Sequence, residues 1–232
     1  MMRFNVLGIG WVTAANCGRG ADALEFAFAG GPLPKLDHHA LFGTAFPRFG
    51  RLDAYTRLGL AGIALALRDA GLDSWTEKRP LGLVASTESG CLETDLQYFQ
   101  SVLPDNGRFA SPNLFAYTLP SCMLGEASIH FGLTGPAFVV QEGGGDVLAG
   151  LKTALGMLSS GLCSTVVAGV CNAPAPPVAL AFTSPPGAVF FVIECAEEGP
   201  LSLCEDAILW RGQPQLSIES LIRSIRTSGY PS

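Results

Sequence analysis

Short, uninterrupted apolar runs alternate along this chain with longer stretches that have helical periodicity. Continuous apolar runs of about four to eight residues are typical of strands that are buried on both faces of a sheet. The pattern predicts such strands over residues 4–9, 81–85, 137–141, 165–170 and 188–195. It predicts helices over residues 22–29, 53–70, 92–102, 122–131 and 147–158, and irregular loops over 30–53 and 104–120.

The C-terminal part of the chain departs from this alternation. Residues 201–210 follow a Glu-Glu-Gly-Pro turn signal and predict a hairpin with the strand before them, and residues 218–225 predict a last short helix. Strands that alternate with helices indicate an α/β fold with a mixed, mostly parallel sheet, helices on both faces and, from the hairpin, an antiparallel edge. Because no long polar linker interrupts the pattern, we expect a single domain over residues 1–232.

Charged residues make up only 15% of the chain and hydrophobic residues 48%. A typical charged share is about 25%, so either the core is large or part of the apolar surface meets a partner. The net charge is −6 and the sequence pI is near 5.0, and no cluster of Lys or Arg interleaves with aromatic residues. This composition excludes a nucleic-acid partner.

The cysteines and the apolar runs bear on location. Seven cysteines are scattered without a C-x-x-C pair or a nearby histidine, so no metal site is expected, and buried thiols of this kind fit a cytoplasmic protein. Asparagine and glycine residues interrupt the first apolar run. This interruption favours a buried strand over an export signal. The stretch 147–170 is long enough to span a membrane, but Lys152 and the Ser-Ser-Gly break at 159–161 divide it. We therefore expect no membrane span.

Residues 131–151 have the strand, turn and helix form that positions a nucleophile. Three glycines at 143–145 follow the strand, and Asp146 is placed to cap the next helix. A side chain at Gly144 would sit at a helix N-terminus, which lowers the pKa of a thiol and offers N–H groups to an oxyanion. Glycine cannot do that covalent work. A phosphate loop is disfavoured as well, because no lysine follows the glycines and Glu142 and Asp146 would repel an anion.

Four segments share the pattern of one enzyme family. They are VLGIGWVT at 6–13, DAYTRLGL at 53–60 with AGL at 70–72, SPNLFAYTLP at 111–120 and GEASIHFGLTGP at 125–136. They resemble, in the same order, segments of the N-terminal half of the β-ketoacyl synthases, which belong to the thiolase superfamily. The resemblance covers about residues 4–195 and leaves a divergent hairpin and helix at 196–232. It implies a three-layer, half-thiolase-like domain.

The resemblance places the nucleophile turn of the family at Glu142, Gly143 and Gly144. The family has a Thr-Ala-Cys sequence there, so the active-site cysteine is missing and no acyl-enzyme is expected. The other catalytic residues of the family, two histidines and a lysine, lie in a C-terminal half that has no counterpart before Ser232. No residue is therefore assigned a catalytic role, and no cofactor is expected. None of the three histidines of the chain matches a family catalytic position: His38, His39 and His130.

The resemblance also bears on assembly, because two similar halves of the family pack with the helix after the nucleophile between them. Here the helix predicted over 147–158 is apolar nearly all round, with Lys152 its only charge. A helix that is apolar on every side is buried on every side. We expect a second chain to cover it, and the alternative is cover by the loops 30–53 and 104–120. The candidate interface residues are Val147, Leu148, Leu151 and Leu155.

The leading functional hypothesis is a catalytically inactive subunit comparable to the chain-length factors of fatty acid or polyketide-type pathways, such as aryl polyene synthesis. Such a subunit would form a homodimer or pair with a ketosynthase-like chain, and an acyl carrier protein is a further candidate partner.

Two other hypotheses stay open. In the first, the chain is a stand-alone module that binds an acyl chain or a pantetheine arm. Its candidate pocket contains Ser86, Cys91, Glu142, Gly143, Gly144 and Gly145. In the second, the chain is an acyl transferase or thioesterase whose nucleophile has moved to Cys122 or Cys91, although neither has a base at a recognisable spacing.

Overall fold

The computed structural model describes residues 2–43, 46–142, 146–174, 176 and 184–229. The strands are β1 (Arg3–Thr13), β2 (Cys17–Arg19), β3 (Gly82–Thr87), β4 (Ala137–Gln141), β5 (Thr165–Asn172), β6 (Gly187–Ala196), β7 (Leu201–Cys204), β8 (Ala207–Trp210) and β9 (Gln213–Gln215). The helices are α1 (His38–Phe42), α2 (Ala54–Asp69), α3 (Leu92–Val102), α4 (Pro112–Phe115), α5 (Cys122–Phe131), α6 (Ala149–Ser159) and α7 (Ile218–Thr227), with 3-10 turns at Phe49–Arg51 and Pro104–Gly107.

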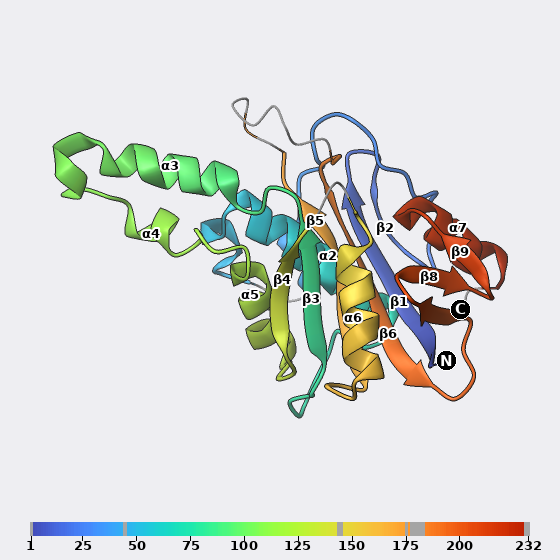
Figure 1. The fold of residues 1–232 in the computed structure, drawn as a ribbon. Coiled ribbons are helices and arrows are strands. Elements are labelled where there is room, and N and C mark those ends of the chain that lie inside the picture. Colours follow the sequence, from blue (N-terminus) through green and yellow to red (C-terminus); the bar gives the residue numbers. More distant parts are fainter. Residues whose placement is uncertain (1, 44–45, 143–145, 175, 177–183, 230–232) are drawn as a thin grey trace.

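The strands form one mixed sheet in the order β4-β3-β5-β6-β1-β7-β8-β9, and β2 pairs with β1 (Figure 1). β3 runs parallel to β4 and β5, whereas β6 runs antiparallel to both β5 and β1. The α/β fold, the mixed sheet and the antiparallel edge of the prediction are confirmed. The antiparallel share extends further than the terminal hairpin, because β6 pairs antiparallel with β5 and β1 in the middle of the sheet.

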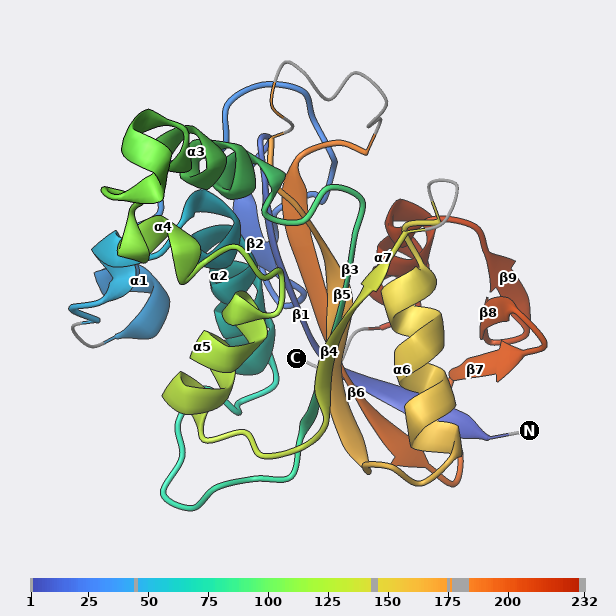
Figure 2. The same ribbon diagram turned by 60° about the vertical axis from the view of Figure 1, so that its left-hand side comes forward.

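Helices cover both faces of the sheet, as the three-layer prediction requires. α2 and α5 lie on one face, and α6 and α7 lie on the other (Figure 2). Two apolar cores result, one on each face. The first is built around α2, in which 12 of 16 residues are buried, and the second lies beneath α6 and α7.

Close contact between β1 and α2 depends on two glycines of β1. A Cβ atom at Gly10 would lie 2.1 Å from the backbone nitrogen of Ala66, and one at Gly8 would lie 2.4 Å from the carbonyl oxygen of the same residue. Backbone atoms cannot move aside as a flexible side chain can. The glycines therefore let the longest helix lie directly on the central part of the sheet.

Residues 22–29 were predicted to form a helix, and this prediction is wrong. The segment forms neither a helix nor a strand, and Phe26 and Phe28 are packed edge-on with ring centroids 5.2 Å apart. Phe26 also meets Trp11 of β1 at 5.6 Å. Arg226 of α7 donates hydrogen bonds to two backbone carbonyls of the segment, which helps to hold it open. Phe26 and Phe28, two residues apart, pack against the core on this face of the sheet. The prediction had assumed that the apolar residues of this segment follow the period of a helix.

The cover of α6 differs from the prediction. Leu148, Leu151 and Leu155 are buried within the chain, and Val147 is partly buried in the same core. Among the described residues, the loops 30–53 and 104–120 do not take part in this core. The cover within the chain is the divergent C-terminal part, β7 to α7, whose core residues here include Leu201, Ile208, Leu221, Ile222 and Ile225. Three of the four candidate interface residues are thus buried inside this chain, and Val147 is partly exposed.

The two predicted loops also contain short helices. Residues 30–53 include α1 and a 3-10 turn, and residues 104–120 include α4 and another 3-10 turn. α3, α4 and the turns around them, residues 92–120, project from the body (Figure 1). We call this projecting segment the arm.

A methyl group at Gly10 tests the contact between β1 and α2. Gly10→Ala should lower the free energy of unfolding by about 2 kcal/mol or more, because the new atom overlaps the α2 backbone. Gly30→Ala is the matched control, since a Cβ atom there meets nothing within 4 Å. Chemical denaturation of both variants measures the difference, and equal stability would contradict the packing described here.

Candidate functional site

The carboxyl ends of β3, β4 and β5 meet in a buried polar cluster. Asn172, at the end of β5, organises it. Its side-chain oxygen accepts hydrogen bonds from the Thr87 hydroxyl at 3.1 Å and from the Glu88 backbone N–H at 2.8 Å. Its amide donates to a carboxylate oxygen of Glu142 at 3.1 Å. One asparagine therefore connects all three parallel strands at the edge where the predicted nucleophile turn begins.

Glu142 is the charged member of this cluster, and its residue is only 5% exposed. Its carboxylate also accepts a hydrogen bond from the Ser184 hydroxyl at 3.1 Å. Burial raises the pKa of the Glu142 carboxyl above its usual 4.5, and the Glu88 and Asp146 carboxylates add to this rise. The hydrogen bonds from Asn172 and Ser184 act in the opposite direction.

Of the predicted pocket, the structure describes Ser86, Cys91 and Glu142. Ser86 is fully buried, and its hydroxyl donates to the Gly169 carbonyl at 3.4 Å. Glu142 is held in the polar cluster, and Cys91 lines a cavity. Gly143, Gly144 and Gly145 lie outside the described residues.

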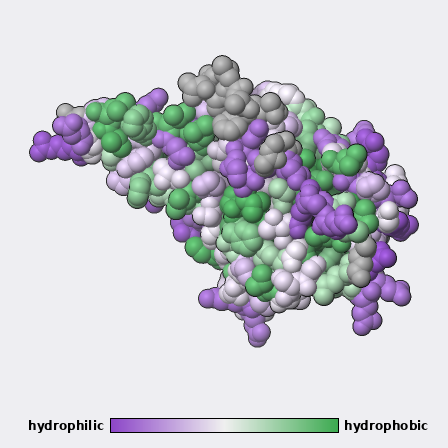
Figure 3. Space-filling model, in the orientation of Figure 1, coloured by the Kyte–Doolittle hydropathy of each residue, from purple (hydrophilic) through white to green (hydrophobic). Residues whose placement is uncertain are grey.

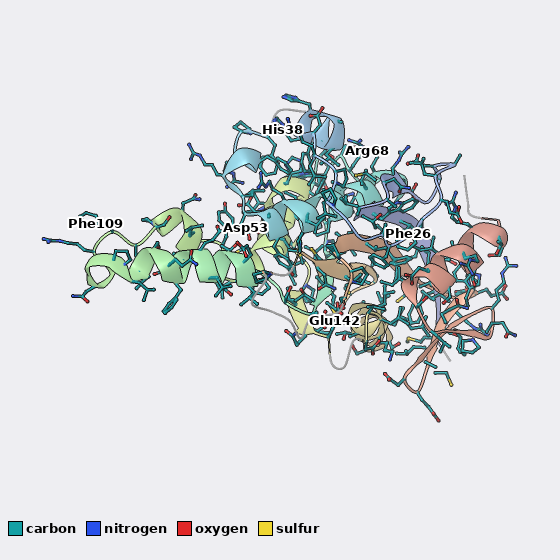
Figure 4. All side chains as sticks on the ribbon, turned by 90° about the horizontal axis from the view of Figure 1, so that it is seen from above. Phe26, His38, Asp53, Arg68, Phe109 and Glu142 are labelled. Atoms are coloured by element: carbon teal, nitrogen blue, oxygen red, sulfur yellow. The ribbon has the colours of Figure 1, made fainter. Side chains whose placement is uncertain are left out.

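A large cavity lies beside the polar cluster and has a volume of about 890 Å³. It opens between the first turns of α2 and α3, with α4 and the segment after β5 as further walls. Asp53 caps α2 there and accepts a hydrogen bond from the Thr94 hydroxyl at 2.7 Å, at the base of the arm (Figure 4). Further lining residues include Arg51, Tyr55, Arg57, Leu114, Tyr117 and Pro174. The sequence pointed to Cys91 but not to these residues, because they lie on segments predicted as loops or as the start of an ordinary helix.

Neither candidate cysteine has the setting of a nucleophile. Burial, together with the Asp95 carboxylate 3.8 Å away, raises the pKa of the Cys91 thiol to about 12. Cys122 donates to the Ala116 carbonyl at 3.1 Å, and burial raises its pKa as well. A reactive cysteine needs a thiolate, and both settings disfavour that form.

The histidines do not supply a base to these thiols. His130 lies in the last turn of α5, as predicted, and its ring packs against Phe42 and Phe46 with centroids 4.8 and 4.9 Å away. Burial lowers its pKa, and the charge of Arg48 lowers it further. His38 and His39 pack against each other at 4.2 Å in α1. The three histidines therefore belong to an aromatic layer on the outside of α2 and α5.

The raised pKa of Glu142 gives a testable pH dependence. A carboxyl whose pKa is higher in the folded state stabilises the fold fully below its unfolded pKa, and this stabilisation is lost as the pH rises through the folded pKa. In Glu142→Gln the free energy of unfolding should fall less than in wild type as the pH rises from about 4.5 to 7.

Denaturation across that pH range measures the effect, with Glu93→Gln as a control for an exposed carboxylate. Parallel curves for wild type and Glu142→Gln would contradict the burial of a charged Glu142.

Comparisons with known proteins agree with the fold. Residues 32–191 match the family described as "Beta-ketoacyl synthase, N-terminal domain". A putative polyketide β-ketoacyl synthase 1 from Streptomyces halstedii is 29% identical over 140 residues, which are 56% of this chain and 33% of that protein. The granaticin polyketide putative β-ketoacyl synthase 1 from Streptomyces violaceoruber is similar to the same extent. The chain thus spans about one third of the length of these relatives.

Solved ketosynthases share the architecture. A ketosynthase in complex with its chain length factor from Xenorhabdus doucetiae has a TM-score of 0.63 at 17% identity, over 89% of this chain and 84% of that chain. The ishigamide ketosynthase/chain length factor has a TM-score of 0.64 at 20% identity, over 88% of this chain and 64% of that chain. Such identities show the fold alone. The family match covers more than half of the chain, and the chain therefore belongs to the β-ketoacyl synthase family, in which it corresponds to the N-terminal domain.

Proposed function

We propose that this chain is a catalytically inactive, ketosynthase-like subunit that pairs with a ketosynthase-like chain in fatty acid or polyketide-type biosynthesis. The observation that carries the proposal is the open edge of β4, which lies on the side of the body from which the apolar arm projects. Similarity to ketosynthases, including complexes with a chain length factor, supports a partner of this class.

β4 lies at the edge of the sheet, and no strand in the described part of the chain pairs with its outer side. The Pro136 carbonyl and the Glu142 N–H form hydrogen bonds with β3. Because the direction of the backbone groups alternates along a strand, the even-numbered residues of β4 also face β3. The N–H and C=O groups of Ala137, Val139 and Gln141 therefore face the open edge. β4 carries no charged residue, and Phe138 is 36% exposed. An uncharged, unpaired edge strand is a template for a strand of another chain.

The arm exposes apolar side chains that its own contacts do not cover. α3 packs mainly against α4 and the turn at Pro104–Gly107, and only Thr94 of its residues is buried. Figure 3 shows apolar patches along the arm and on the body beneath it. Large apolar side chains at its surface are Phe99, Leu103, Phe109, Phe115 and Leu119, with exposures from 57% to 74%. Grouped exposure of this kind marks a protein interface.

The absence of activity is part of the proposal. In the sequence, Gly144 stands where the family has its cysteine. The thiols of Cys91 and Cys122 are poor alternatives, because their pKa values are raised.

We include an acyl carrier protein as a second partner, which calorimetry with the carrier protein tests. A cytoplasmic location belongs to the same proposal. Among the helices in the described part of the chain, none has the length and hydrophobicity that crossing a bilayer requires.

One observation favours a second candidate, the binding of an acyl chain or pantetheine arm by this chain alone. The cavity of about 890 Å³ next to Ser89 and Cys91 lies within the size range of small-molecule sites, about 300–1,000 Å³. It borders the segment where the sequence placed a pocket. Calorimetry with an acyl-CoA tests this candidate, and an absence of heat would remove it.

The open edge can be tested with two substitutions at one residue. Val139→Pro removes an N–H group that faces the open edge and spares the hydrogen bonds to β3, whereas Val139→Ala shortens the same side chain and keeps the N–H. After co-expression with the ketosynthase encoded nearest to this chain in its genome, Val139→Pro should weaken the complex by about tenfold relative to Val139→Ala.

Sedimentation of the purified complexes measures this difference, and sedimentation of the chain alone reports a homodimer in the same way. Equal binding by Val139→Pro and Val139→Ala in both experiments would contradict pairing through β4.

The arm has an independent test. Phe99→Ser with Phe109→Ser should weaken the same complex by about tenfold or more, because aromatic anchors dominate interface energies. Leu216→Ser is the control, since Leu216 is 87% exposed and lies next to α7, outside the arm. The thermal midpoint of the free chain should stay nearly unchanged in both variants. Complexes of equal strength would exclude the arm from the interface.

A further inference from the structure

Two arginines line the large cavity between α2 and α3. Arg51 ends a 3-10 turn and is exposed, and Arg57 lies in the first turn of α2 and is half-buried. Among the described residues, neither guanidinium has an ion pair or a side-chain hydrogen bond. By contrast, Arg48, close by in sequence, pairs with Glu126 at 3.2 Å.

The two carboxylates that line the cavity, Asp53 and Glu93, accept hydrogen bonds from groups of α2 and α3. Asp53 accepts hydrogen bonds from the Thr56 N–H at 2.9 Å and from the Thr94 hydroxyl at 2.7 Å. Glu93 accepts one from the side-chain amide of Gln97 at 2.9 Å. Neither carboxylate therefore neutralises Arg51 or Arg57 by direct contact.

The inner wall of the cavity is apolar. Tyr55 lines it, and its residue is 2% exposed. The apolar lining also includes Leu52, Leu114, Tyr117, Ala173 and Pro174.

We propose that this cavity binds an amphipathic anion, with an apolar chain against Leu52 and Leu114 and a carboxylate or phosphate head group at Arg51 and Arg57. Such a head group accepts charge-assisted hydrogen bonds from guanidinium groups. The inference deepens the second candidate function by naming the class of ligand. It does not depend on the pairing of this chain with another subunit.

Calorimetry with three probes of equal chain length tests the proposal: decanoate, decyl phosphate and decanol, each below its micelle concentration. The anions should bind about tenfold more tightly than decanol, and their advantage should shrink at high salt. Preference for decanoate or for decyl phosphate identifies the head group. Arg57→Gln and Arg51→Gln should each weaken anion binding by about fivefold and leave decanol unchanged, while Arg3→Gln on the exposed start of β1 changes neither.

Each adverse result overturns a separate statement. Equal affinity for decanol and the anions, or unchanged binding in both cavity variants, would overturn the role of the arginines. No heat with any probe would overturn the ligand site itself. The pairing of subunits is measured by sedimentation and is not decided by either result.

Discussion

The packing of the C-terminal segment against α6 determines how this chain completes its fold. α6 is apolar nearly all round, and one of its faces meets the sheet. The remaining apolar surface needs cover, which the chain supplies from β7, β8 and α7. With this contact made, both apolar cores are closed within one polypeptide. On the opposite side of the molecule the arm projects, and none of the strands that the structure describes pairs with the outer edge of β4.

The polar cluster at the strand ends has a structural role that the family resemblance did not indicate. Glu142 stands at the turn where an active ketosynthase continues to its nucleophile, and here it binds Asn172 and Ser184. These contacts connect the ends of the parallel strands to the chain before β6. A buried carboxylate that is satisfied in this way specifies one arrangement of the strand ends, although burial raises its pKa. Glu142 is therefore a structural link between the strand ends.

Much of the fold could be predicted from the sequence, because buried strands and long amphipathic helices leave strong hydrophobic patterns. The helix predicted over 53–70 matches α2, and the strand over 137–141 matches β4. The hydrophobic pattern failed to predict the structure of residues 22–29, where two phenylalanines spaced by two residues pack against the core from a segment that is not helical. The cover of α6 was missed for another reason: hydrophobic periodicity shows that a surface is buried but not which segment buries it. The cavity was missed because Arg51, Tyr55 and Tyr117 meet only through tertiary structure.

Hydrogen exchange at α6 and at β4, with and without the ketosynthase-like partner, tests the central claim most directly. The structure predicts that the amides of Leu151 and Leu155 are protected in the free chain and change little in the complex. The amides of Val139 and Gln141 should exchange fast in the free chain and become protected when the partner binds. Protection of α6 that appears only in the complex, with β4 unchanged, would contradict the account, because it would place the partner where this structure places the C-terminal segment.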